Sequence, residues 1–190
     1  MKNRLVISYD SSQCTGKTTL INALKRKYDI FNIQREPVRN ILKDKEKVNF
    51  ADDNIQLRIL NNQRSYILEN NYILQDRSPL SSYCYTSYLR SKNKTNIEDD
   101  IFDFIEEESK IIMQSKLIDY VVVLPIEFEM IDDGFRTVDK QQQKDIQDLI
   151  DDTIKKWGIE YKVLRPSGTV EERVAFLSKI IDGYLLRDTE

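Results

Sequence analysis

Residues 11–18 (Ser-Ser-Gln-Cys-Thr-Gly-Lys-Thr) match the phosphate-binding pattern G-x-x-x-x-G-K-[ST] at every fixed position except the first, which is Ser11. In this pattern Gly16 lets the backbone approach a phosphate, Lys17 contacts the β- and γ-phosphates, and the Thr18 hydroxyl binds Mg²⁺. Ser11 alters the start of the loop, at a cost of about 1 kcal/mol if its φ is positive, but it removes no phosphate ligand. We therefore expect ATP and Mg²⁺ to bind through Ser12, Gln13, Cys14, Thr15, Gly16, Lys17, Thr18 and Thr19.

Composition excludes several other kinds of chemistry. The chain of 190 residues contains no histidine and has a net charge of −3. The lack of histidine excludes His-based nucleophile triads and the usual His metal sites, so a general base must be a carboxylate or a lysine. The acidic net charge gives no broad basic field for nucleic acid, although a local basic patch could still form.

The cysteines and the apolar runs indicate a cytoplasmic protein without a membrane partner. Cys14 and Cys84 lie far apart and lack metal-ligand spacing, which suggests a reducing compartment. The N-terminus leads directly into a strand pattern, so we expect no signal peptide. The longest apolar run, Tyr120–Ile126, is too short to cross a bilayer.

Short apolar segments alternate with helical patterns along the whole chain. A helix is predicted to start at Ser78 as N-cap with Pro79 next, and capping boxes at Thr95–Glu98 and Thr169–Glu172 predict two more helix starts. Gly158 is predicted to end a helix over Lys140–Trp157. The predicted strands are Leu5–Tyr9, Ile30–Ile33, Tyr72–Leu74, Tyr120–Leu124 and Ile159–Leu164.

This order predicts an α/β fold, a three-layer sandwich with a five-stranded parallel sheet, in a single domain over residues 1–190. Ligands of such folds bind beyond the carboxyl ends of the strands. The loops after the first four strands are therefore the candidate site. An N-K-x-D guanine motif is missing, since Asn93–Asn96 ends without aspartate, and Asp76 is followed by arginine instead of a second acid. A small-molecule kinase fits this pattern better than a GTPase or a motor ATPase.

At these residues the chain resembles the P-loop nucleoside and nucleotide kinases. Deoxynucleoside kinases have an acid before the phosphate loop, then E-P-V, then acid-Arg-Ser, and here Asp10, Arg35–Val38 and Asp76–Ser78 stand in those places. Thymidylate kinases share R-E-P and D-R, although the glycines that follow there are absent here. The later segment, with DDGFRTVD and EERV, is similar to the ribosylnicotinamide kinase type.

The resemblance implies roles for individual residues. Glu36 matches the base that accepts the proton of the substrate hydroxyl, and Asp76 either competes for that role or binds Mg²⁺ with Thr18. Arg77 would orient the acceptor or the transferred phosphoryl group. Arg136 resembles a lid arginine in a short lid over approximately residues 126–138, with Gly134 as a hinge. The implied catalytic residues are Glu36, Asp76, Lys17, Arg77 and Arg136, and those for the substrate are Asp10, Arg35, Glu36, Arg39, Gln56 and Arg77.

The leading hypothesis is a Mg·ATP-dependent kinase that phosphorylates a hydroxyl of a nucleoside-type small molecule. One alternative acceptor is a nucleoside monophosphate, whose phosphate Arg35, Arg39 and Arg77 could bind together. Others are a 5′-hydroxyl or modified-base hydroxyl of nucleic acid, which the net charge disfavours, and a non-catalytic ATP-sensing module. The helix from Thr95 could also pair with a second copy in a homodimer.

Overall fold

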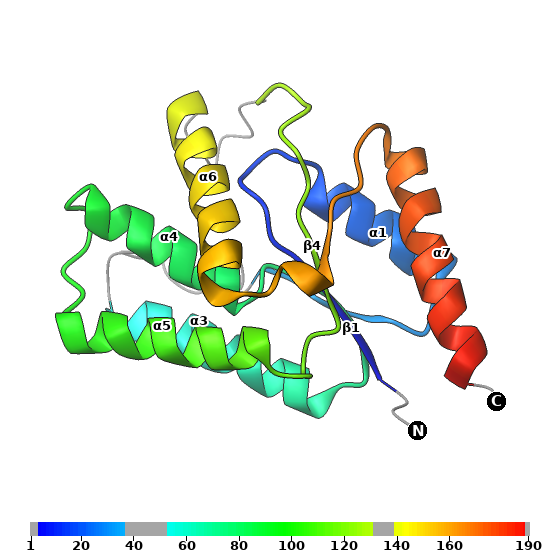
Figure 1. Cartoon of the computed structure of the whole chain (residues 1–190), viewed down its shortest axis with the longest axis horizontal. Coiled ribbons are helices and arrows are strands. Elements are labelled where there is room, and N and C mark those ends of the chain that lie inside the picture. The colour runs from blue at the N-terminus through cyan, green and yellow to red at the C-terminus, as the bar shows by residue number, and fades with distance from the viewer. Residues whose placement is uncertain (1–3, 37–52, 131–138, 189–190) are drawn as a thin grey trace, which may run out of the picture.

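The computed structural model describes residues 4–36, 53–130 and 139–188. These contain one five-stranded sheet in the order β2-β3-β1-β4-β5, and every neighbouring pair is parallel. The strands are β1 (Leu5–Tyr9), β2 (Asn32–Gln34), β3 (Tyr72–Asp76), β4 (Tyr120–Val122) and β5 (Val163–Leu164). The predicted α/β fold with a five-stranded parallel sheet is therefore confirmed (Figure 1).

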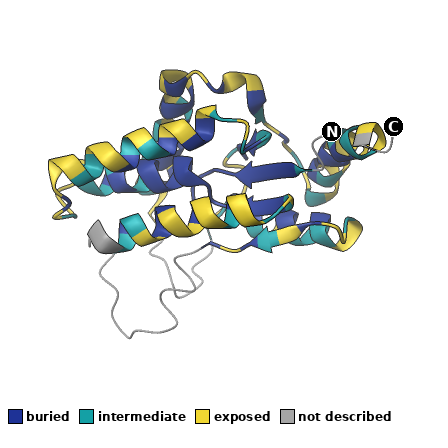
Figure 2. Cartoon of the chain, turned by 90° about the horizontal axis from the view of Figure 1, so that it is seen from below, coloured by how far each residue is buried: buried dark blue, intermediate teal, exposed yellow. Residues whose placement is uncertain are grey.

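Helices cover both faces of this sheet, because the side chains of β1 alternate between two cores. Leu5, Ile7 and Tyr9 pack with α1 and α7, whereas Val6 packs with α3, α4, α5 and α6. The buried sheet lies between these layers in Figure 2. The helices are α1 (Lys17–Lys27), α3 (Asp53–Glu69), α4 (Pro79–Ser91), α5 (Asp99–Gln114), α6 (Lys140–Trp157) and α7 (Val170–Asp188), with a 3₁₀ turn, η1 (Glu160–Lys162).

Three of the predicted helix boundaries are confirmed by their hydrogen bonds and dihedral angles. The Ser78 hydroxyl accepts a hydrogen bond from the Leu80 amide, and Pro79 follows as the first helical residue of α4. The Thr169 amide donates to the Glu172 carboxylate while the Glu172 amide donates to the Thr169 hydroxyl, which forms the capping box of α7. Gly158 ends α6 with a left-handed φ of 64°.

Two other predictions were wrong in detail. The segment Ile159–Leu164 is a strand only at its last two residues, because the 3₁₀ turn η1 occupies Glu160–Lys162 and lets Lys162 donate to the Ser115 and Ile118 carbonyls. The long helix begins at Asp99 rather than near Thr95. The Thr95 hydroxyl accepts a hydrogen bond from the amide of residue 97, two positions on, and this local turn replaces the capping box.

The remaining boundaries move by a few residues, as with β2, which starts at Asn32 instead of Ile30. In the described ranges, no helix combines the length and the apolar character needed to cross a membrane. The predicted lid falls partly on residues 131–138, which lie outside the described residues.

Candidate functional site

The carboxyl ends of β1, β2 and β3 bring the predicted site residues to one edge of the sheet. The phosphate loop follows β1, Glu36 lies two residues after β2, and Asp76 and Arg77 stand at the end of β3. β1 and β3 are direct neighbours, with Tyr9 paired to Asp76. Parallel pairing therefore places the loop beside the acid that sequence reasoning assigned to metal or proton chemistry.

The Lys17 ammonium is buried inside the phosphate loop. It donates to the carbonyl oxygens of Ser11 (3.0 Å) and Ser12 (2.5 Å) and contacts the Thr15 hydroxyl at 3.3 Å. Gly16, at φ +87°, is the N-cap of α1 and has no side chain to cap the first amides of that helix. Uncapped amides at a helix N-terminus, next to a lysine, form the arrangement that binds phosphate groups.

The serine at the first position of the pattern has a structural explanation. Non-glycine residues with positive φ in the described part of the chain are Cys14, Arg77 and Asn93, so Ser11 does not need the backbone freedom of glycine. Its hydroxyl instead accepts a hydrogen bond from the Leu124 amide (2.6 Å), just beyond β4. Within the loop it is Cys14 that takes the left-handed conformation, with φ at 57°.

Two glutamines of α6 hold the loop from the side. The Ser12 amide donates to the Gln147 side chain at 3.0 Å, and the Gln143 side-chain amide donates to the Gln13 carbonyl at 2.7 Å. Both α6 side chains are buried. Sequence reasoning missed them, although two glutamines one turn apart on the same helix face as Ile146 and Ile150 are a readable signal.

Thr18 and Asp76 form the candidate metal site. The Thr18 hydroxyl donates to the Asp76 carboxylate at 2.8 Å, and Asp76 is buried. A hydroxyl and a carboxylate oxygen are hard ligands of the kind that Mg²⁺ prefers beside substrate phosphates. The described residues contain no group of three or more His, Cys, Asp or Glu that could bind a metal by themselves. The pair thus fits a metal that takes its other ligands from water and phosphate.

Arg77 and Glu36 form a buried ion pair on the other side of Asp76. Arg77 Nε lies 2.6 Å from Glu36 Oε1, and the guanidinium lies over the Tyr85 ring, 4.3 Å from its centroid. Burial alone would lower the pKa of Arg77, but Glu36, Tyr85 and Asp76 outweigh it, so the pKa is raised and the charge is retained. Arg77 Nη1 is buried without a hydrogen-bond partner among the described residues.

The backbone of Arg77 is fixed in an unusual conformation. Its φ is 74°, which a side chain with a β-carbon rarely adopts. The Gln63 side-chain amide donates to the Arg77 carbonyl at 2.9 Å, while Gln63 accepts a hydrogen bond from Ser82. This buried glutamine of α3 was also missed from the sequence. It holds the turn that directs Asp76 and Arg77 to different partners.

Asp10 is fully buried between β1 and the start of α4. Its carboxylate accepts hydrogen bonds from the Ser78 amide (2.9 Å), the Ser78 hydroxyl (2.7 Å) and the Ser81 hydroxyl (2.6 Å), with the Ser81 amide at 3.3 Å. Sequence reasoning placed Asp10 among the substrate-binding residues. Its contacts tie the phosphate loop to the Asp76–Ser78 segment.

The other predicted site residues differ from one another in burial and in hydrogen-bond partners. Arg35 is exposed and donates to Asn22 of α1 at 2.7 Å. The buried Gln56 accepts a hydrogen bond from Thr86, and the Gln13 side chain accepts one from Tyr85. In the phosphate loop Cys14 is half-buried, and Thr19, in the first turn of α1, is exposed. Arg39, Gly134 and Arg136 lie outside the described residues.

Comparisons with known proteins support the fold that positions these residues. The sequence model of a family described as an AAA domain matches residues 12–173. Among solved structures, NadR protein in complex with NR aligns with a TM-score of 0.66 and 20% identity over 86% of this chain. The alignment covers only 45% of the NadR chain, so this chain spans less than half its length. No curated protein sequence matches it.

Two further structures are similar over nearly the full length of both chains. Deoxyadenosine kinase from M. mycoides aligns with a TM-score of 0.66 and 14% identity, over 95% of this chain and 99% of that one. Thymidylate kinase from Ehrlichia chaffeensis aligns with a TM-score of 0.58 and 15% identity, over 94% and 98%. The fold is therefore that of the P-loop nucleoside and nucleotide kinases, as the sequence motifs predicted.

Proposed function

This chain belongs to the AAA domain family, and on that premise we propose that it is an ATP-dependent kinase that phosphorylates a hydroxyl of a nucleoside-type small molecule. Its structural neighbours include a deoxyadenosine kinase and a thymidylate kinase, and one NadR structure contains AMP-PNP. These neighbours support the reaction class. The choice of acceptor rests on the contacts at the edge of the sheet.

The proposal rests on one observation: the consecutive residues Asp76 and Arg77 bind partners on opposite sides of the site. Asp76 accepts a hydrogen bond from Thr18, which belongs to the phosphate-loop side of the site. Arg77 pairs with Glu36, which follows β2. One short segment thus contacts both the loop suited to the donor phosphates and the residues suited to the acceptor. Phosphoryl transfer requires that juxtaposition because its catalysis is mainly positioning and electrostatics.

In the proposed reaction each residue has a distinct task. Lys17 and the loop amides bind the phosphates of ATP and neutralise charge on the transferred group. Thr18 and Asp76 hold Mg²⁺, which supplies further charge neutralisation when it is bound. Glu36 accepts the proton of the acceptor hydroxyl, and Arg77 holds Glu36 in place and orients the acceptor. Asp76 is thereby assigned to the metal instead of the proton.

The local charges favour a neutral acceptor group over a monophosphate. The positive charge of Arg77 is already balanced by the Glu36 carboxylate at 2.6 Å. Arg35 points to Asn22 at the surface, so the described residues do not assemble a cluster of arginines around a second phosphate. A neutral hydroxyl can approach Glu36 without electrostatic repulsion, whereas the charged phosphate of a monophosphate would be repelled by the Glu36 carboxylate.

The test is a transfer assay with labelled ATP on a panel of acceptors, with Lys17→Met as the inactive control. The panel contains nucleosides, ribosylnicotinamide, nucleoside monophosphates and 5′-hydroxyl or modified DNA. Transfer to a nucleoside or to ribosylnicotinamide supports the proposal. Transfer only to monophosphates, or salt-sensitive transfer only to DNA, would replace the proposed acceptor. ATP binding without transfer to any acceptor would indicate a sensing module.

A further inference from the structure

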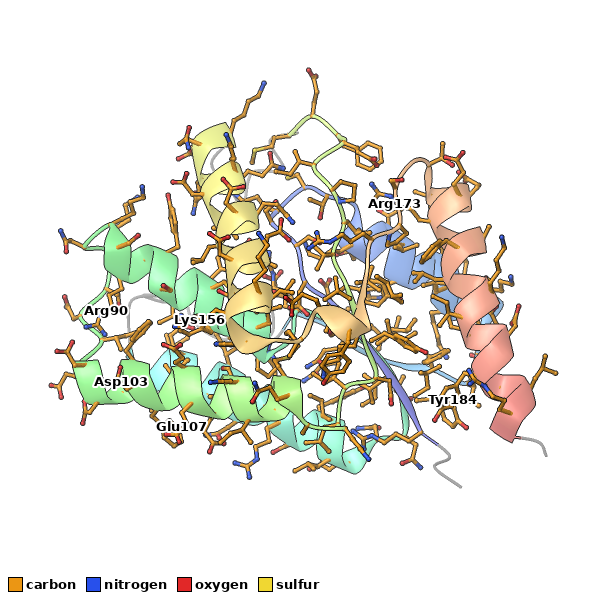
Figure 3. The ribbon with its side chains drawn as sticks, in the orientation of Figure 1. Arg90, Asp103, Glu107, Lys156, Arg173 and Tyr184 are labelled. Carbon is orange, nitrogen blue, oxygen red and sulfur yellow. The ribbon has the colours of Figure 1, made fainter. Side chains whose placement is uncertain are left out.

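Arg173 is a buried arginine at the outer side of the phosphate loop, and the proposed reaction gives it no task. It lies in the second turn of α7 on the side that faces α1, as Figure 3 shows. Only 1% of its surface is exposed. Its Nη1 donates to the Thr15 carbonyl at 2.7 Å, and its Nη2 donates to the Glu127 carboxylate at 2.6 Å. An arginine buried this deeply is retained only where its charge has specific partners.

The bond to Thr15 acts on the backbone that faces the phosphates. A trans peptide unit is planar, with its carbonyl and its N–H pointing in opposite directions. The Thr15 carbonyl belongs to the same peptide unit as the Gly16 N–H. A guanidinium that holds the carbonyl on the outer side therefore fixes the Gly16 N–H toward the inner side of the loop, where Lys17 lies. Charge-assisted hydrogen bonds of this kind are stronger than neutral ones.

The surroundings of Arg173 fix its guanidinium from several directions. The same Glu127 oxygen that accepts from Arg173 also accepts a hydrogen bond from the Gly168 amide at 2.9 Å. The hydrogen bond from Arg173 lowers the pKa of Glu127, so this partner stays ionised. The guanidinium also lies 4.9 Å from the centre of the Phe128 ring. The segment after β4 thus contacts the Arg173 side chain through Glu127 and Phe128, and Gly168, after β5, holds Glu127 in place.

Arg173 and Phe128 pack so closely against Gly16 that a side chain there would be crowded. A β-carbon added there would lie 3.3 Å from Arg173 Nη1 and 3.5 Å from the Phe128 ring. Arg173 and Phe128 therefore cover the outer face of the turn closely, and the glycine is needed for this contact as well as for its positive φ.

We infer that Arg173 is a positioning residue for the donor phosphates. It fixes the Thr15–Gly16 peptide so that the Gly16 N–H can donate a hydrogen bond to a phosphate oxygen. This inference rests on the proposed function, because it requires the loop to bind a polyphosphate. An alternative role for Arg173 is to contact the nucleobase of ATP together with the exposed ring of Phe128. A polyphosphate probe that has no base distinguishes the two roles.

The experiment is calorimetric titration of the full chain with Mg·AMP-PNP and, separately, with magnesium tripolyphosphate. We expect Arg173→Met to weaken the binding of both ligands by roughly tenfold, because the Thr15–Gly16 peptide is no longer fixed and each ligand must order the Gly16 N–H when it binds. Arg173→Lys keeps the charge but cannot donate to both oxygens at once, so its loss should be intermediate. Arg165→Met is the matched control, since Arg165 forms an exposed ion pair with Asp151 and should leave both affinities unchanged.

A spectroscopic readout checks the mechanism and does not depend on affinity. The chain has five glycines, so a sample labelled with ¹⁵N-glycine gives few backbone signals. In Arg173→Lys the signals of Gly16 and Gly168 should shift, because both amides adjoin the Arg173–Glu127 pair. Those of Gly158 and Gly183, which have open space around them, should stay in place and show that the fold is retained.

Each outcome of these measurements decides something. Equal weakening of both ligands, together with the Gly16 shift, supports the inference. Weakening of Mg·AMP-PNP alone would assign Arg173 to the nucleobase and overturn it, and unchanged affinities in both variants would make Arg173 a purely structural contact. If Arg173→Met does not fold, the lysine variant decides on the same criteria. If the native chain binds neither probe, the proposed function fails first, and this inference fails with it.

Discussion

The two sides of the candidate site, which we propose for the phosphate donor and the acceptor, are built in different ways. On the donor side, the Lys17 ammonium donates to the Ser11 and Ser12 carbonyls of its own loop, and Gln147 and Arg173 support that loop from α6 and α7. On the acceptor side, Arg77 depends on Glu36 and Gln63, which come from other elements of the fold. A local motif can thus be preserved while the acceptor residues change. The difference explains why a phosphate-binding loop is easier to recognise in a sequence than the residues of an acceptor site.

The largest expected effect comes from removing the lysine of the donor side. Lys17→Met should reduce phosphoryl transfer by about 10³-fold, because it removes a preorganised cation from the transferring group. Single-turnover assays with labelled ATP measure the loss, and circular dichroism checks the fold. Turnover within tenfold of the native rate would mean that the loop is not the donor site.

On the acceptor side, Glu36→Gln should slow the chemical step by about 10²-fold. Glutamine keeps the size of the side chain but cannot accept the proton of the acceptor hydroxyl. Rapid-quench measurements of the first turnover separate this step from product release. If Asp76→Asn, at saturating Mg²⁺, slows the chemical step more than Glu36→Gln does, Asp76 and not Glu36 accepts the proton.

The connection between the two sides is tested by Asp10→Asn. This substitution weakens the hydrogen bonds from Ser78 and Ser81 to a fully buried carboxylate and should lower the free energy of unfolding by about 2 kcal/mol. Urea titration gives the value. Asp29→Asn is the matched control, because Asp29 is fully exposed beside Lys25 and should have almost no effect. Equal effects of the two variants would show that Asp10 does not join the sides.

Asp76→Asn should raise the Mg²⁺ concentration needed for half-maximal activity by about tenfold. The amide is a weaker ligand for Mg²⁺ than the carboxylate that contacts Thr18. Rates measured across a Mg²⁺ titration show the shift, and excess Mg²⁺ should restore much of the activity. A loss of rate that Mg²⁺ does not relieve would contradict the metal assignment.

The smallest effect sharpens the choice of acceptor. Arg35→Met should change the acceptor KM by about twofold or less, because Arg35 is exposed and bonded to Asn22. A monophosphate acceptor bound by Arg35 predicts a loss several times larger. Initial-rate kinetics with the preferred acceptor distinguish the two.

The features that sequence reasoning predicted are those set by nearby residues or by strand order. Ser78 with Pro79 starts a helix through a bond two residues away, and Thr18 meets Asp76 because both follow strands that pair in parallel. The same reasoning failed at Thr95, where a competing local turn uses the hydroxyl. It also failed at Ile159–Leu164, where a 3₁₀ turn interrupts an apolar run.

The residues that were missed act over long sequence separations. The site is contacted from α3, α6 and α7 by Gln63, Gln147 and Arg173, and no local sequence pattern predicts these long-range contacts. Each nevertheless left a trace, because a polar side chain on the buried face of an amphipathic helix requires a partner. Arg173 precedes Leu177 and Ile181 at steps of four residues on α7. An arginine in register with core residues is a signal that could have been read.

The bond between Asp10 and the Ser78 amide also has a consequence for the order in which the chain folds. It joins residues 68 positions apart, and because the pairing of β1 with β3 already offsets the cost of closing that loop, we expect the bond to form together with this pairing. A chain in which these strands have not yet paired therefore lacks the bond that ties Asp10, before the phosphate loop, to Ser78. Hydrogen exchange at the Ser78 amide should accordingly follow global unfolding, and fast exchange by local opening would contradict this.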